Sequence, residues 1–154
     1  MGKSLTLGSL FGIRIKVHWS FSLIIACWLF ASLISGSSLL GALASVGFVL
    51  VLFGCVVLHE LGHALAARYF GIATRDITLL PIGGVARLER MPRQPLQELV
   101  VALAGPAVNV VIAGVLFAFL LPTAGLGNLI AAPLGGGGFL QQLMFVNVAL
   151  VLFK

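Results

Sequence analysis

Residues 19–58 form a run of forty residues without one charged side chain. About 20 apolar residues cross a hydrocarbon core as a helix, so this run is about twice as long as one span needs. Its only polar cluster is Ser35 to Ser38, where a turn is expected. The run therefore predicts two membrane helices, the first from Trp19 to Ile34 and the second from Leu39 to Phe70.

The composition of the whole chain supports a membrane protein. Hydrophobic residues make up 60% of the sequence and charged residues only 8%, which excludes an ordinary soluble domain. The formal net charge is +5, but the basic residues lie in short segments that flank apolar runs, where they are typical topology signals. We therefore expect the lipid bilayer as the surroundings of the chain and no nucleic-acid partner.

Two further apolar segments follow in the second half of the chain. A third helix is expected from about Leu96 to Leu121, and a glycine-rich loop at 122–138 leads to a last apolar run, Phe139 to Phe153. As a helix, that run would span only about 22 Å of a core of roughly 30 Å. The expected fold class is an all-α polytopic membrane bundle with about four transmembrane segments and small membrane-associated β-hairpins.

The two polar parts of the chain have strand patterns. Residues 1–18 alternate apolar and polar positions, which predicts interfacial strands, although a signal peptide is an alternative interpretation. Residues 71–95 contain two short strand-like runs around Pro81 to Gly84, which predicts a cytoplasmic β-hairpin loop. Its edge could pair with an extended substrate peptide, or the segment could be a loop without a substrate role.

The distribution of positive charge predicts the orientation. Basic residues precede the first span and follow the second, whereas the loops at 35–38 and 122–138 carry none. These residues are Lys3, Arg14, Lys16, Arg75, Arg87, Arg90 and Arg93. We therefore expect a cytoplasmic N-terminus.

The second predicted helix contains His59, Glu60 and His63 near its far end. A charged group at the centre of a bilayer costs roughly 3 kcal/mol, so ionisable residues there indicate a functional site. Residues i and i+4 share a helix face, and His59 and His63 can therefore direct both imidazoles at one zinc ion. Glu60 lies about 100° around the helix, where it could take a proton from a water molecule that the metal activates. The spacing is that of a metalloprotease helix.

Other polar residues in the apolar segments give weaker signals. Cys27 and Cys55 fit as small hydrophobic residues, and Cys55 is too far from His63 along the helix for both to bind one ion. His18, next to Trp19, fits an interfacial side chain. Asn109 needs a hydrogen-bond partner in lipid and either faces the site or ties two helices together.

With these residues in hand, the chain resembles the site-2 protease family of intramembrane zinc metalloproteases, in particular the branch whose members often carry CBS domains. Four motifs carry the resemblance, which runs nearly end to end. They are the segments Gly12 to Trp19, His59 to His63, Pro81 to Leu88 and Ala104 to Asn109.

The resemblance implies a single protease core over residues 1–154, built on three helices with membrane-associated strands. It implies Zn²⁺ held by His59, His63 and an aspartate on a later helix, with Glu60 as the general base. The implied function is intramembrane endopeptidase activity on transmembrane segments of membrane-tethered proteins, that is, regulated intramembrane proteolysis. The implied location is the plasma membrane.

One departure from the family pattern concerns the third metal ligand. In the family, a segment like Phe139 to Phe153 is followed by an Asn, then prolines and the ligating Asp-Gly, whereas Lys154 stands in the place of that Asn and is the last residue. We therefore expect the third ligand beyond residue 154, a core incomplete at the C-terminus, and weak or no activity from these residues alone.

Two alternatives remain open on the sequence. In membrane proteases whose third ligand is a glutamate, Glu89 or Glu98 would have to reach His59. A membrane scaffold or binder with the same fold would have no turnover at all. The sequence gives no indication of the oligomeric state.

Overall fold

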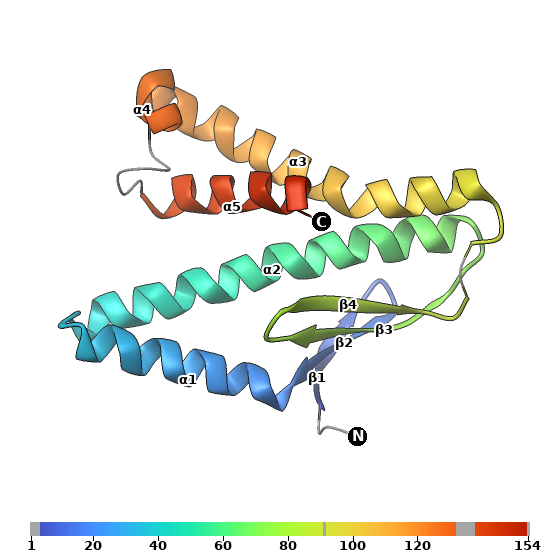
Figure 1. Cartoon of the computed structure of the whole chain (residues 1–154), viewed down its shortest axis with the longest axis horizontal. Coiled ribbons are helices and arrows are strands. Elements are labelled where there is room, and N and C mark those ends of the chain that lie inside the picture. Colours follow the sequence, from blue (N-terminus) through green and yellow to red (C-terminus); the bar gives the residue numbers. More distant parts are fainter. Residues whose placement is uncertain (1–3, 91, 132–137, 154) are drawn as a thin grey trace.

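The computed structural model describes residues 4–90, 92–131 and 138–153 (Figure 1). Lys3, Met91, Lys154 and part of the predicted glycine-rich loop lie outside these ranges. The elements in chain order are β1 (Ser4–Leu10), β2 (Ile13–His18), α1 (Trp19–Ile34), α2 (Leu39–Tyr69), β3 (Thr74–Leu80), β4 (Gly83–Leu88), α3 (Pro95–Ala124), α4 (Leu126–Ala131) and α5 (Phe139–Phe153).

The uncharged run divides into α1 and α2 at the predicted place. Gly36 has a φ of 86°, a conformation that glycine adopts without strain, and it allows the chain to turn. Ser38 then caps α2 by accepting a hydrogen bond from the backbone N–H of Gly41 at 3.2 Å. The polar cluster was therefore a valid boundary signal.

The prediction of a mostly helical fold with a small β component is confirmed. Within the described residues, α2 with 31 residues and α3 with 30 are long and apolar enough to cross a membrane. The helices α1 and α5 are apolar but shorter, with 16 and 15 residues. Two of the four predicted spans thus meet the length of a full crossing.

The predicted loop at 122–138 was partly wrong. Helix α3 continues past Leu121 to Ala124 and ends where Gly125 takes a φ of 73°. The short helix α4 then follows, and its Leu129 is buried against the α3 and α5 residues Ala113 and Met144. Burial of this leucine favours a helical turn that its glycine-rich surroundings did not indicate.

The strands form one four-stranded sheet with the order β1-β2-β3-β4. The β1–β2 and β3–β4 pairs are antiparallel, and β2 pairs in parallel with β3. One face of the sheet lies on α2, where Ile13 and Ile77 pack against Leu61 and Ala64. The predicted strand segments therefore share one sheet, and their interfacial and cytoplasmic placement stays a prediction.

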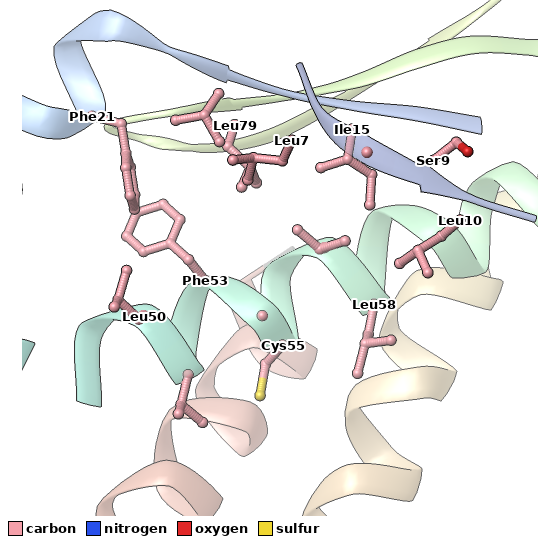
Figure 2. A pocket seen from close by; sticks show the side chains of 15 residues that line it. Leu7, Ser9, Leu10, Ile15, Phe21, Leu50, Phe53, Cys55, Leu58 and Leu79 are labelled. Carbon is pink, nitrogen blue, oxygen red and sulfur yellow. The ribbon is translucent and has the colours of Figure 1, made fainter. Parts of the chain in front are cut away.

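A groove of about 730 Å³ lies between β1 and α2 (Figure 2). Its lining is almost entirely apolar and includes Leu7 and Leu10 of β1 and Leu50 and Leu58 of α2. Neither His59 nor His63 lines this groove. The groove is therefore separate from the histidine pair.

An ion pair on the other face of the sheet joins strands from both hairpins. Lys16 on β2 contacts the buried carboxylate of Asp76 on β3 at 2.6 Å, and Arg87 on β4 lies 3.8 Å from its other oxygen. The hydrogen bond from Lys16 holds the pKa of Asp76 below its ordinary value, and the charges of Lys16 and Arg87 act in the same direction. Desolvation opposes this shift. The ionised form of Asp76 therefore stabilises the sheet.

Asp76→Asn should lower the free energy of unfolding at pH 7 by about 2 kcal/mol, since it leaves Lys16 without its charged partner. A folded-state pKa below the unfolded value of about 3.9 means that this stabilisation is complete above pH 4 and is lost as the pH falls further. Melting temperatures of wild type and variant in detergent should therefore converge below about pH 4.

Glu89→Gln is the matched control, because the Glu89–Arg75 pair spans 3.8 Å between exposed side chains. It should change stability by less than about 1 kcal/mol at either pH. A pH-independent difference between Asp76→Asn and wild type would contradict the assigned role.

Candidate metal centre

His59 and His63 meet on one face of α2. Their Nε2 atoms are 3.1 Å apart, and the two rings stand edge to face at 80°. His59 is only 2% exposed, and Glu60 between them along the chain is buried too. The predicted i, i+4 geometry therefore brings two imidazole nitrogens to one buried point.

Helix α3 fixes the orientation of His63. The Nδ1 atom of His63 lies 2.7 Å from the carbonyl oxygen of Val101, and because a carbonyl only accepts, Nδ1–H is the donor. The lone pair of this imidazole is then on Nε2, which faces His59. A backbone carbonyl on the far nitrogen is the usual way in which proteins set the tautomer of a metal-binding histidine.

The two histidines fit a zinc ion. Two nitrogens bound tetrahedrally at about 2.0–2.1 Å are about 3.3 Å apart, close to the separation here. Within residues 4–90, 92–131 and 138–153, no group of three or more His, Cys, Asp or Glu side chains lies close enough to hold a metal. The described residues thus offer two candidate ligands, His59 and His63.

Small residues allow α3 to approach the histidine face of α2. A methyl group added at Gly62 would lie 2.7 Å from the carbonyl oxygen of Ala104 and 2.8 Å from the side chain of Val108. A methyl group added at Gly105 would overlap the ring of His63. Gly62 and Gly105 are therefore required by close contacts, and the Ala104 to Asn109 motif positions a site residue.

Strand β4 covers Glu60. The backbone N–H of Ala86 donates to Oε2 of Glu60 at 3.3 Å, and a methyl group on Gly84 would lie 2.6 Å from Cγ of Glu60. The hairpin that the sequence assigned to a cytoplasmic loop thus has its last strand directly against the candidate general base.

The remaining candidates lie away from the histidine pair. His18 is the N-cap of α1 and contacts Ser20. Glu89 pairs with Arg75, and Glu98 is exposed in the first turn of α3. The alternative in which Glu89 or Glu98 is the third ligand is therefore wrong within the described structure, because neither carboxylate joins the two histidines in a group of three possible ligands.

Sequence reasoning missed three groups that shape the site. Two are backbone groups: the Val101 carbonyl contacts His63, and the Ala86 N–H contacts Glu60. The third is the side chain of Asn147, which contacts Cys55 one turn before His59. Backbone groups leave no residue-type signal. Asn147 did carry one, as an amide inside an apolar helix.

Comparison with known proteins agrees with this geometry. Residues 47–152 match the model of a family described as Peptidase family M50. A relative from Synechocystis is 37% identical over 100% of the chain and 40% of its own length. A zinc metalloprotease from Methanocaldococcus jannaschii is 39% identical over 75% of the chain and 32% of its own length.

A solved structure extends the match to the fold. The site-2 protease from Methanocaldococcus jannaschii aligns with a TM-score of 0.72 and 30% sequence identity, over 98% of this chain and 63% of that one. The chain thus spans less than half of the two curated relatives and under two thirds of the solved chain.

Gly105→Ala should displace the ring of His63 and weaken zinc binding about 10-fold or more, as expected when the support of a metal ligand is disturbed. Gly114→Ala on the same helix is the matched control, since nothing lies within 4 Å of an added methyl group there. Both substitutions raise helix propensity equally. Chelator competition measures the affinities, and equal values for the two variants would refute the role of Gly105.

Proposed function

The chain belongs to peptidase family M50, the site-2 protease family of zinc metalloproteases, and on this basis we propose that it forms the core of an intramembrane endopeptidase. The cofactor that family membership implies is Zn²⁺. The observation that carries the proposal is the convergence of the His59 and His63 Nε2 atoms, 3.1 Å apart, beside Glu60 on an apolar helix. The reaction is hydrolysis of a peptide bond in or next to a transmembrane segment of a membrane-tethered protein.

The residues of the chain have distinct roles in this proposal. His59 and His63 hold the metal through Nε2, with a third ligand supplied from outside the described residues. When bound, zinc polarises the scissile carbonyl and lowers the pKa of water near it. Glu60 accepts a proton from the attacking water on its carboxylate and delivers it to the amide nitrogen as the C–N bond breaks.

Strand β4 is the proposed docking edge for the substrate. It is one of the two outer strands of the sheet, and its Ala86 N–H already contacts the carboxylate of Glu60. A helical substrate hides its amide bonds in its own hydrogen bonds and must be unwound before cleavage. An extended peptide added to β4 would keep its backbone paired while it lies beside Glu60.

The placement in the membrane is part of the same proposal. We propose that α1, α2, α3 and α5 are the four transmembrane segments, in a plasma membrane, with the N-terminus cytoplasmic. Helix α2 is about 46 Å long, and His59 lies about 15 Å from its end at Tyr69. Arg68 lies in the last turn of α2 and Arg90 contacts the Gly71 carbonyl just beyond it, which supports cleavage from the cytoplasmic half and release of the product inward.

Glu60→Gln should reduce cleavage about 100-fold to 10,000-fold, because a glutamine cannot accept the proton, while zinc stays bound through the unchanged histidines. Cleavage of a membrane-tethered substrate is measured in detergent with protein from the complete reading frame. The zinc content per protein chain is measured on the same samples. Unchanged turnover in Glu60→Gln would contradict the assignment.

His63→Ala is the companion variant and should lose zinc as well as activity. A wild-type zinc content near zero would instead favour the alternative of a scaffold or binder that retains the fold without turnover.

Site-selective labelling tests the orientation. The variants carry single cysteines at Ser37 and Arg90 in a background lacking Cys27 and Cys55. Both positions are exposed; Ser37 lies two residues before α2, and Arg90 contacts the Gly71 carbonyl just beyond its other end. Ser37→Cys should react with an impermeant reagent from outside intact cells, and Arg90→Cys only after the membrane is opened. Labelling at position 90 from outside would overturn the orientation and inward release.

A further inference from the structure

Two asparagines that the proposed mechanism does not use are completely buried in the helix bundle. Asn109 on α3 and Asn147 on α5 are both 0% exposed. Neither the Oδ1 nor the Nδ2 atom of Asn109 has a hydrogen-bond partner, and the same holds for Oδ1 of Asn147. Buried polar atoms in proteins are nearly always paired, so three open atoms at one level of a bundle indicate an additional group.

The two asparagines lie at the same level of the α3–α5 interface. These helices run antiparallel (Figure 1), and Ala113 and Met144 pack in the same cluster between them. Asn109 lies one turn before Ala113 on α3, and Asn147 lies nearly one turn after Met144 on α5. Because the two helices are antiparallel, both asparagines are displaced toward the same end of the bundle from the Ala113–Met144 contact. The open amide groups therefore belong to one region between the helices.

This region lies one turn from the histidines. The Nδ2 atom of Asn147 donates to Sγ of Cys55 at 3.6 Å, and Cys55 shares a face of α2 with His59, four residues on. Figure 2 shows that the sulfur of Cys55 points away from the strands. Asn109 follows Gly105, the residue against His63, by the same interval of four.

Different helices thus hold the two ends of the histidine segment. Helix α3 holds His63 through the Val101 carbonyl and the close approach of Gly105. Helix α5 holds the turn before His59 through Asn147 and Cys55. The meeting of the two Nε2 atoms therefore depends on how α3 and α5 are placed relative to each other.

We propose that Asn109 and Asn147 bind an internal water molecule between α3 and α5, and that this hydrated pair positions His59 relative to His63. A buried water typically makes about three hydrogen bonds, and the pair offers three open atoms, two acceptors and one donor group. Both asparagines are positioning residues, since they act through helix placement and not on the substrate. The inference rests on the proposed zinc site.

A direct tie between helices is the simpler role for a buried asparagine, but Asn109 makes no such hydrogen bond. Asn147 does bond within its own helix, donating to the Leu143 carbonyl at 2.9 Å, and this leaves its Oδ1 open. Bound water accounts for all three atoms without moving a helix.

The test replaces each amide by a side chain of the same branching, Asn109→Leu and Asn147→Leu, in protein from the complete reading frame. The zinc dissociation constant should rise about 10-fold or more, the range seen when the support of a metal ligand is lost. The melting temperature of the zinc-free double variant, which carries both leucines, should not fall, because neither buried amide then remains to be left unpaired. Asn128→Leu is the control, since Asn128 is exposed on α4 and bonds only the Ala124 carbonyl there.

X-ray radiolytic labelling detects the water itself, because radicals formed at bound water oxidise neighbouring side chains. The buried Met144 should be oxidised in wild type and protected in Asn109→Leu. An unlabelled Met144 in wild type, or wild-type zinc affinity in both leucine variants, would overturn the proposal.

A second pair of variants covers the case in which the leucine variants fold poorly. Asn109→Ser and Asn109→Ala differ by one hydroxyl group, and only serine can still hold the water. The Asn109→Ser protein should bind zinc more tightly than the Asn109→Ala protein. Equal zinc affinities of the two variants would refute the inference. Failure of the wild type to bind zinc would instead refute the proposed function.

Discussion

The burial of His59, Glu60 and His63 within an apolar helix is the constraint on which the rest of the structure depends. Ionisable groups in a low-dielectric interior are tolerated only when other groups pair with them. Each is met by a different neighbour. The Val101 carbonyl of α3 accepts a hydrogen bond from His63, and the Ala86 N–H of β4 donates one to Glu60. The ring of His59 contacts the ring of His63.

These contacts explain where the chain uses small residues. Gly62 and Gly105 allow the backbones of α2 and α3 to approach, and Gly84 does the same between β4 and Glu60. In contrast, Gly114 on α3 has open space around it and carries no such requirement. The glycines that matter are thus identified by what a methyl group would strike, and all three surround the candidate site.

The sheet gives β4 its fixed position. One face of the sheet packs on α2 through Ile13 and Ile77. On the other face, Asp76 forms ion pairs with Lys16 and Arg87, which connect β2, β3 and β4. The parallel pairing of β2 with β3 links the beginning of the chain to a hairpin some sixty residues later. A flexible loop could not hold a backbone N–H at a buried carboxylate, whereas a strand anchored on both faces can.

The sequence by itself determined the apolar helices and the placement of His59 and His63, the candidate metal ligands, on one helix face. The uncharged run, the Ser35 to Ser38 break and the i, i+4 histidines are local patterns, and local backbone geometry converts them directly into structure. Only the tertiary structure decided that the two hairpins form one sheet, that Leu129 folds into α4, and that Val101, Ala86 and Asn147 lie at or near the site. Those features depend on contacts between residues far apart in the chain, and two of the groups are backbone atoms that every residue possesses. No pattern of residue types along the sequence encodes such pairings.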